Sequence, residues 1–292
     1  MGKVSWVFPG QGSQASGMGS DLCEVAFARE KFAQAEEALG WCVNKKSQCS
    51  DEELAQTEYT QPCLYTIESI LVDLLKEKGL SCDYAAGHSL GEYVALYAAG
   101  VFDFATGLEL VKKRSQIMSQ VKGGQMAALM KFDRSQLDSL IEKSEEVVIA
   151  NDNSADQVVV SGTPAGIEAI LSQVKAKRSI LLKVSGAFHS PYMNDAANEF
   201  GDILEQIEFK SAQFPVFSNV DPTPSKDPVI LKQRLKKQMT GSVRWLETMQ
   251  EMSRLDVAEV VEIGPGKVLT GLFKRTTPEI ALKNISALND MV

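Results

Sequence analysis

The feature that most constrains this chain is the pentapeptide Gly87-His88-Ser89-Leu90-Gly91. A short strand-like segment, 83–87, precedes it, and a helical segment that ends near residue 99 follows it. This is the setting of a nucleophile elbow, G-x-S-x-G, in which close packing leaves no room for side chains at the glycines. The serine hydroxyl then lies at the start of a helix, where backbone N–H groups and the helix dipole stabilise a developing anion. The pentapeptide predicts a nucleophilic Ser89; the alternative is an ordinary glycine-rich turn.

The remaining pattern predicts an α/β fold. Strand-like segments at 4–8, 216–219 and 257–263 alternate with helical periodicity at 27–39, 61–78, 105–121 and 227–238. A recurring strand–turn–helix order is typical of a parallel sheet flanked by helices. We therefore expect an α/β-hydrolase-like core that carries the nucleophile elbow.

The segment 126–184 has a different rhythm. It is interpreted as strand 126–130, helix 134–143, strands 147–150 and 157–161, helix 164–175 and strand 180–184. This β-α-β-β-α-β order is ferredoxin-like. The sequence therefore predicts a small ferredoxin-like domain, residues 124–186, inserted into a discontinuous large domain of residues 1–123 and 187–292.

Composition and charge exclude several classes of protein. The 292 residues carry a net charge of −8, which disfavours a nucleic-acid partner. The longest nearly apolar run, 93–102, is about half the length that spans a bilayer, and the first residues run directly into a strand without room for a signal peptide. Five irregularly spaced cysteines and only two histidines predict free thiols and no metal site. We expect a cytoplasmic protein that binds no membrane.

A serine hydroxyl needs a base to act as a nucleophile at neutral pH. His88 adjoins Ser89 on the turn, so its side chain is expected to point away and to pack or form a hydrogen bond. The other histidine, His189, lies where the small domain returns the chain. A lone histidine is more often structural, but a real elbow makes His189 the base by elimination.

Arg114 is the second unusual residue. Apolar residues one helical turn away, Leu110, Val111, Ile117 and Met118, place it on an interior face. A buried guanidinium is costly unless an anion pairs with it. The partner is either a buried carboxylate of the chain or, in a bidentate pair, a carboxylate of the substrate, and the spacing does not decide between them.

Six motifs together resemble the malonyl-CoA:acyl-carrier-protein transacylases of bacterial-type fatty acid synthesis. They equally resemble the related acyltransferase domains of polyketide synthases. The resemblance covers the whole chain, in the family's order and spacing. The motifs are Phe8-Pro9-Gly10-Gln11-Gly12-Ser13-Gln14, Thr60-Gln61-Pro62, Gly87-His88-Ser89-Leu90-Gly91-Glu92, Arg114, Gly186-Ala187-Phe188-His189-Ser190 and Glu262-Ile263-Gly264-Pro265-Gly266.

The resemblance implies a role for each matching residue. Ser89 would be the acylated nucleophile and His189 its base. The backbone N–H groups of Gln11 and Leu90 would form the oxyanion hole, and Arg114 would bind the malonyl carboxylate.

Two further positions are carried over from the family. By its distance from Val243-Arg244-Trp245, the backbone carbonyl of Gln238 would orient His189, although Ser242 replaces a proline that is frequent in the family. Phe188 resembles the version of the family that takes unbranched malonyl groups.

The resemblance implies ping-pong transfer of malonyl from malonyl-CoA to the phosphopantetheine thiol of acyl carrier protein, without a metal or another cofactor, by a monomer. Carrier proteins of this kind are acidic, so two basic clusters are candidate docking sites. One holds Lys175, Lys177, Arg178 and Lys183, and the other holds Lys267, Lys274 and Arg275. The alternative for both, and the interpretation of the basic run 232–237, is a solvated surface.

Three other functions are alternatives to this one. An acyl hydrolase could use the same Ser89–His189 pair but has no need of Arg114. A malonyl transferase of a malonate-decarboxylase system would differ mainly in its carrier protein. A catalytically silent carrier-binding subunit would not need Ser89 and His189. The sequence leaves the carrier protein and the strictness of malonyl selectivity open, and it assigns no role to the polar turn Asn151-Asp152-Asn153.

Overall fold

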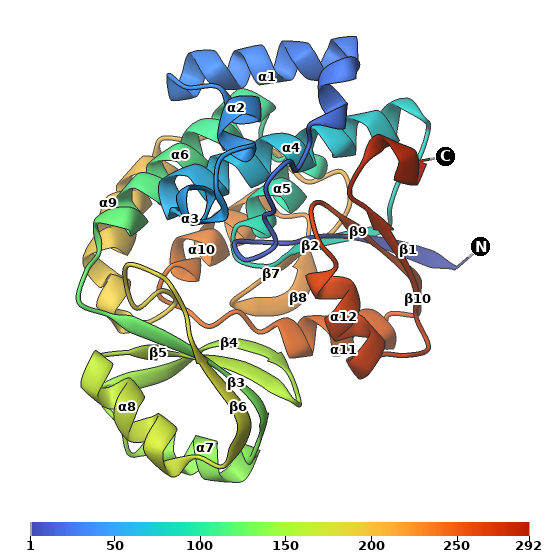
Figure 1. The fold of residues 1–292 in the computed structure, drawn as a ribbon. Helices are drawn as coiled ribbons and strands as arrows, with labels where there is room; N and C mark the ends of the chain where they lie inside the picture. The colour runs from blue at the N-terminus through green and yellow to red at the C-terminus, as the bar shows by residue number, and fades with distance from the viewer. Residues whose placement is uncertain (1, 292) are drawn as a thin grey trace.

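A computed structural model describes residues 2–291, which form two β-sheets with helices around them (Figure 1). The larger sheet has the strand order β10-β9-β1-β2-β7-β8, and all its neighbours are parallel except β7 and β8. Its strands are β1 (Lys3–Phe8), β2 (Tyr84–Gly87), β7 (Val216–Ser218), β8 (Asp221–Ser225), β9 (Val257–Ile263) and β10 (Ala281–Ile285). The predicted α/β class with a parallel sheet is confirmed.

Helices bury both faces of this sheet. One face is covered by α1 (Ala26–Leu39), α4 (Thr57–Glu77), α5 (Gly91–Ala98), α6 (Phe104–Gln120), α9 (Asn194–Glu205) and α10 (Pro228–Gln238), and the other by α11 (Trp245–Arg254) and α12 (Val268–Thr276). Shorter elements connect them: α2 (Val43–Ser47), α3 (Asp51–Leu54) and the 3₁₀ helices η1 (Asp21–Glu24), η2 (Pro191–Met193) and η3 (Leu288–Met291).

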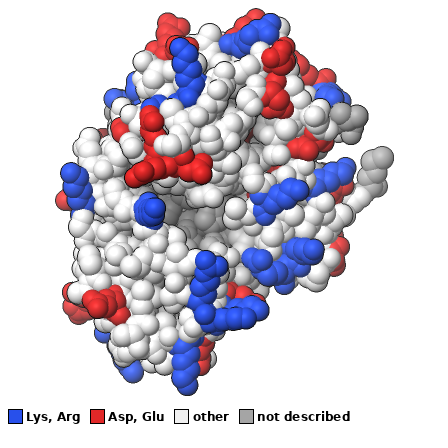
Figure 2. All heavy atoms as spheres, in the orientation of Figure 1, with Lys and Arg blue, Asp and Glu red and all other residues white. Residues whose placement is uncertain are grey.

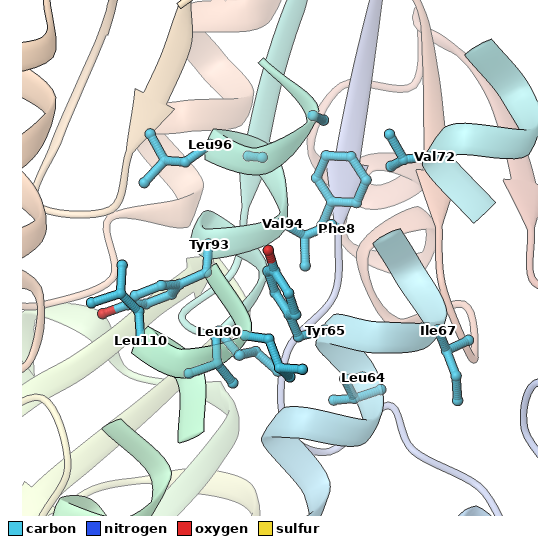
Figure 3. Close-up of a cluster of buried hydrophobic side chains, with 14 of the residues drawn as sticks. Phe8, Leu64, Tyr65, Ile67, Val72, Leu90, Tyr93, Val94, Leu96 and Leu110 are labelled. Carbon is cyan, nitrogen blue, oxygen red and sulfur yellow. The ribbon is translucent and has the colours of Figure 1, made fainter. Parts of the chain in front are cut away.

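Alternation along β1 explains why the strands are apolar throughout. Trp6 and Phe8 point into the core beneath α4 and α5, whereas Val7 points toward α11 and α12. Figure 3 shows part of the first core, where Phe8 and Tyr65 of α4 lie close to Val94 of α5. A strand buried on both faces reads as an apolar run.

The smaller sheet is antiparallel and has the strand order β4-β5-β3-β6. Its elements follow one another as β3 (Gln125–Phe132), α7 (Arg134–Glu142), β4 (Val147–Ser154), β5 (Gln157–Gly162), α8 (Pro164–Gln173) and β6 (Ala176–Leu181). The two helices pack on one face through Leu137 and Ile167, while Met126 and Ala128 on the other face join the core of the larger sheet. The small sheet is therefore packed onto the main body, below it in Figure 1.

Three details of the small sheet correct the prediction. The last strand was expected at 180–184 but is Ala176–Leu181, and the preceding helix ends at Gln173 rather than 175. β6 is an edge strand, where exposed charged residues such as Lys177 and Arg178 are tolerated, so its apolar pattern is weak. Asn151-Asp152-Asn153 is not a turn: it belongs to β4.

All five cysteines are free thiols, as predicted. No helix within residues 2–291 combines the length and the apolar character needed to cross a membrane.

Candidate active site

Ser89 lies on a tight turn between β2 and α5, with a backbone φ of 52°. A Cβ atom on Gly87 would lie 1.8 Å from the backbone carbon of Gly91, and one on Gly91 would lie 2.1 Å from the carbonyl oxygen of Phe8. The N–H of His88 donates to that same carbonyl at 2.9 Å. The expected close packing at both glycines is confirmed, and it presses the turn against the end of β1.

The side chains of Ser89 and His189 meet although they are 100 residues apart. Their Oγ and Nε2 atoms are separated by 2.8 Å. On the other side of the ring, Nδ1 faces the carbonyl oxygens of Gln238 at 2.9 Å and Gly241 at 3.2 Å. A carbonyl oxygen can only accept, so Nδ1 carries the hydrogen and Nε2 offers its lone pair to the serine hydroxyl. This tautomer is the one that a general base requires.

The Gln238 carbonyl is available because Gln238 is the last residue of α10, where carbonyls have no partner within the helix. Ser242, in place of the frequent proline, does not displace it. Burial, followed by the positive charge of Arg114, lowers the pKa of His189 to about 3. The imidazole is therefore neutral at pH 7 and able to accept a proton.

The backbone N–H groups of Gln11 and Leu90 donate to no acceptor within residues 2–291. The loop that carries Gln11 lies on the elbow, because a Cβ on Gly10 would be 2.4 Å from the His88 carbonyl oxygen and 3.6 Å from the Leu90 nitrogen. Leu90 is also the N-cap residue of α5, and a negative charge is favoured at this end of a helix. An oxyanion hole requires N–H groups without such an acceptor, and its assignment to Gln11 and Leu90 stays a prediction.

Arg114 is fully buried and forms no salt bridge with any residue that the structure describes. Its two terminal nitrogens donate to neutral oxygens: to Gln61 Oε1 at 2.7 Å, and to Ser89 Oγ and Gln238 Oε1 at 3.1 Å each. Its Nε has no hydrogen-bond partner in the part of the chain that the structure describes. Of the two alternatives for this residue, a carboxylate in direct contact with the guanidinium is not found within residues 2–291: the buried carboxylate of Glu92 is connected to Arg114 through the side chain of Gln238.

A small chamber of about 90 Å³ adjoins the serine. Its polar lining residues are Gln11, Gln61, His88, Ser89, Asn151 and His189, and its apolar ones are Met118, Met126, Leu182, Val184 and Phe188. Val184 also lines a groove of about 970 Å³. The groove is formed by α3, the start of α4, the end of α6 and the segment 183–185 that follows β6. The charged residues that line this groove are Asp51 and Glu52 of α3, Glu58 of α4, and Lys183, which follows β6.

In Figure 2 the surface is hollowed near the centre of the view. Acidic side chains gather above this hollow, and basic side chains gather below it and to the right. The four predicted docking residues are exposed and form no ion pair within the described chain: Lys177 and Arg178 in β6, and Lys274 and Arg275 in the last turn of α12. Arg178 lies five residues, or roughly 16 Å of extended chain, before Lys183 at the groove.

His88 points away from the serine, as expected. Its Nε2 lies 2.8 Å from Asn153 Oδ1, and its ring packs edge-on against Trp245. Asn153 thereby gains a role that the sequence did not assign, since it joins the small sheet to the elbow. Beside it, backbone hydrogen bonds link β4 to Val243, from Val243 N to Ala150 O at 2.8 Å and from Asp152 N to Val243 O at 2.9 Å.

Sequence reasoning missed three polar residues around Ser89: Gln61, Glu92 and Asn219. Gln61 accepts from Arg114, and Asn219 Oδ1 accepts from the Ser89 N–H at 2.7 Å. Gln61 and Glu92 stood within recognised motifs, which could have identified them. Asn219 is the last residue of the segment 216–219, which was expected to be a strand. Nothing in the sequence pattern indicated that its side-chain amide would contact Ser89.

A parallel α/β fold with a serine on the elbow and a neutral histidine beside it defines the class of serine-dependent acyl-transfer enzymes. The family model described as "Acyl transferase domain" matches residues 5–288. The malonyl CoA-acyl carrier protein transacylase of Synechocystis sp. is 59% identical over 289 residues, covering 99% of each chain.

Solved structures of malonyl transacylases are similar to this chain over nearly its whole length. The crystal structure of the Synechocystis sp. malonyl-CoA:ACP transacylase has a TM-score of 0.98, at 59% identity and 99% coverage of both chains. A malonyl-transacylase in complex with its type II polyketide synthase acyl-carrier protein has a TM-score of 0.93, at 35% identity, covering 99% of this chain and 97% of the other. The chain belongs to the acyl transferase domain family and, within it, to the malonyl-CoA:acyl-carrier-protein transacylases.

Proposed function

We propose that this protein moves a malonyl group from malonyl-CoA to the phosphopantetheine thiol of an acyl carrier protein, supplying malonyl units for fatty acid synthesis. The observation that carries the proposal is the buried Arg114, which forms no salt bridge within residues 2–291 and donates to Ser89 Oγ. A guanidinium in that position suits a substrate whose carboxylate lies next to the reacting thioester.

In the first half-reaction, Ser89 Oγ attacks the thioester carbonyl and its proton passes to His189 Nε2. The resulting oxyanion is bound by the N–H groups of Gln11 and Leu90, each typically worth about 3 kcal/mol in the transition state. The C–S bond then breaks, the thiolate of coenzyme A takes the proton from His189, and malonyl remains as an ester on Ser89.

In the second half-reaction, the thiol of the carrier protein gives its proton to His189 and attacks the ester carbonyl. The C–O bond to Ser89 breaks, and the serine oxygen takes the proton back. Coenzyme A thioester is a substrate, and the two half-reactions balance without an added cofactor.

Selectivity would depend on the chamber beside the serine. Arg114 would hold the malonyl carboxylate with Gln61 supporting its guanidinium. Phe188 forms part of the apolar wall, which leaves little room for a branch on the acyl chain.

The groove that shares Val184 with the chamber is large enough for the pantetheine arm. Lys183 on the groove, with Lys177, Arg178, Lys274 and Arg275, would attract an acidic carrier protein. The solved complex of a related malonyl-transacylase with its acyl-carrier protein supports such a partner.

We also propose the finer organisation of the fold. The element order and the strand order β4-β5-β3-β6 favour a ferredoxin-like domain of residues 124–186 within an α/β-hydrolase-like domain of residues 1–123 and 187–292. A cytoplasmic monomer remains the expected state, which light scattering on the purified protein would test.

The test of the reaction is intact-protein mass spectrometry after mixing with malonyl-CoA, followed by addition of acyl carrier protein. We expect a malonyl-sized adduct on the wild type, its absence on Ser89→Ala, and its discharge onto the carrier protein. Release of free malonate without an adduct would instead identify a hydrolase, and no reaction at all would overturn the proposal.

A further inference from the structure

Glu92 is a buried carboxylate in the first turn of α5, three residues after Ser89, and the half-reactions above do not use it. Two donors meet on its Oε2 atom: the backbone N–H of Asn219 at 3.1 Å and the side-chain Nε2 of Gln238 at 2.7 Å. The three residues belong to α5, to the end of β7 and to the end of α10. Glu92 therefore joins segments that are far apart in the sequence.

The first of these donors, Asn219, also binds the backbone of the elbow at Gly87 and at Ser89. Asn219 Oδ1 accepts from the Ser89 N–H at 2.7 Å, and Asn219 Nδ2 donates to the Gly87 carbonyl at 2.6 Å. Both bonds depend on where the Asn219 backbone lies, and that backbone is bound to Glu92.

The second donor, Gln238, also contacts Ser89, Arg114 and His189. Gln238 Nε2 also donates to the Ser89 carbonyl at 2.9 Å, and Gln238 Oε1 accepts from Arg114 at 3.1 Å. Its backbone carbonyl accepts from His189 Nδ1 at 2.9 Å. A shift of the Gln238 side chain would therefore disturb the serine and the arginine together.

We propose that Glu92 is a positioning residue for acyl transfer: through Oε2 it fixes Asn219 and Gln238, and through them it holds Ser89 in register with His189 and Arg114. The inference rests on the proposed function. Ser89 has a φ of 52°, a conformation that persists only where surrounding contacts over-determine it. The bonds from Asn219 and Gln238 to the Ser89 N–H and C=O supply such contacts.

The cost of burying this carboxylate supports the same conclusion. An acidic group without a salt bridge is expensive to bury, and burial raises the pKa of Glu92 to about 7. Nearby charge comes from Arg114 in α6, and His189 faces the same network from its loop. A side chain that only filled space here would have no need of an oxygen that accepts from two donors.

Three variants separate the possibilities. Glu92→Gln keeps one acceptor oxygen, Glu92→Asp withdraws the carboxylate by one methylene, and Glu92→Ala removes it. Exposed Glu109 on α6, which pairs with Lys112 and Lys113, provides the matched control Glu109→Ala.

The measurement is single-turnover acylation by rapid quench, with malonyl-CoA and with acetyl-CoA, normalised to the adduct formed at long times. We expect the maximal rate of Glu92→Ala to fall roughly 100-fold with both thioesters, because a misplacement of about 1 Å can cost that much. The half-saturating concentration should change less than about threefold, since the groove is intact. Glu92→Asp should fall roughly tenfold, and Glu92→Gln less than about fivefold.

Two outcomes would overturn the inference. A Glu92→Ala protein with a lowered melting temperature but an unchanged normalised rate would show a role in stability alone. An equal loss in Glu92→Gln and Glu92→Ala would show that the charge, not the acceptor, matters. If Glu92→Ala does not fold, Glu92→Asp decides the question. A wild type that forms no adduct would instead refute the proposed function.

Discussion

The Nδ1 atom of His189 lies 2.9 Å from the backbone carbonyl oxygen of Gln238, in the place where many serine enzymes have a carboxylate. A carbonyl fixes the tautomer and the direction of the ring but brings no full negative charge. The histidine therefore gains little stabilisation as imidazolium, and burial beside Arg114 keeps it neutral. A base of this kind suits thioester chemistry, in which the leaving thiolate needs little assistance.

Arg114→Ala should lose the preference for malonyl over acetyl. A hydrogen bond to a charged group contributes about 1.5–3 kcal/mol. The rate of acylation by malonyl-CoA should therefore fall roughly 10- to 100-fold. Acylation by acetyl-CoA, which has no carboxylate, should change much less. Parallel mass spectrometry with the two thioesters measures the ratio, and Arg114→Lys is the control that keeps the charge without the planar fork. An unchanged ratio would remove Arg114 from substrate recognition.

The acylation rate should not fall as the pH drops through 6.5. His189 has its pKa lowered to about 3, so it stays unprotonated well below the range in which an exposed histidine titrates. Single-turnover acylation between pH 5 and pH 8 tests this. Glu92→Gln serves as the background, because it removes the neighbouring group whose pKa is raised to about 7. An acidic limb near 6.5 in that background would contradict the prediction.

Glu92 should make the wild type less stable as the pH rises. Its pKa is raised from 4.5 to about 7, so the folded state holds the proton more tightly than the unfolded state does. Its contribution is full below pH 4.5, declines through pH 7 and is then constant. At 1.36 kcal/mol per pKa unit, the decline is about 3 kcal/mol. Glu92→Gln lacks this dependence. The unfolding free energy of the variant minus that of the wild type should therefore increase between pH 4.5 and pH 8, as urea titrations at each pH would show.

Local patterns account for what the sequence predicted well. The elbow is a five-residue pattern with a strand before it and a helix after it, and the presence of only two histidines leads from Ser89 to His189. The helix 227–238 and the strand 257–263 likewise follow from short-range periodicity, and the structure has them at Pro228–Gln238 and Val257–Ile263.

Tertiary packing decided what the sequence did not predict. No helix was assigned to Trp245–Arg254, although Trp245, Met249 and Met252 have helical spacing. The predicted position of the last strand of the small sheet, β6, was wrong, because an edge strand with exposed charges lacks an apolar pattern. Glu92 meets Asn219 and Gln238 across 127 and 146 residues, so only the packing of α5, β7 and α10 creates that network.

The double variant Lys177→Glu/Arg178→Glu should slow transfer to the carrier protein and spare acylation by malonyl-CoA. Both residues are exposed on the edge strand β6, several residues from the groove, so they can meet a protein but not the reacting thioester. A reversed charge at a rim mainly lowers the association rate, here by roughly tenfold at low salt and less at high salt. Stopped-flow measurement of each half-reaction separates the two effects. Lys210→Glu/Lys226→Glu is the control, because it changes the net charge equally at exposed positions outside the groove. Equal losses in both half-reactions, or in both double variants, would show that β6 is an ordinary solvated surface.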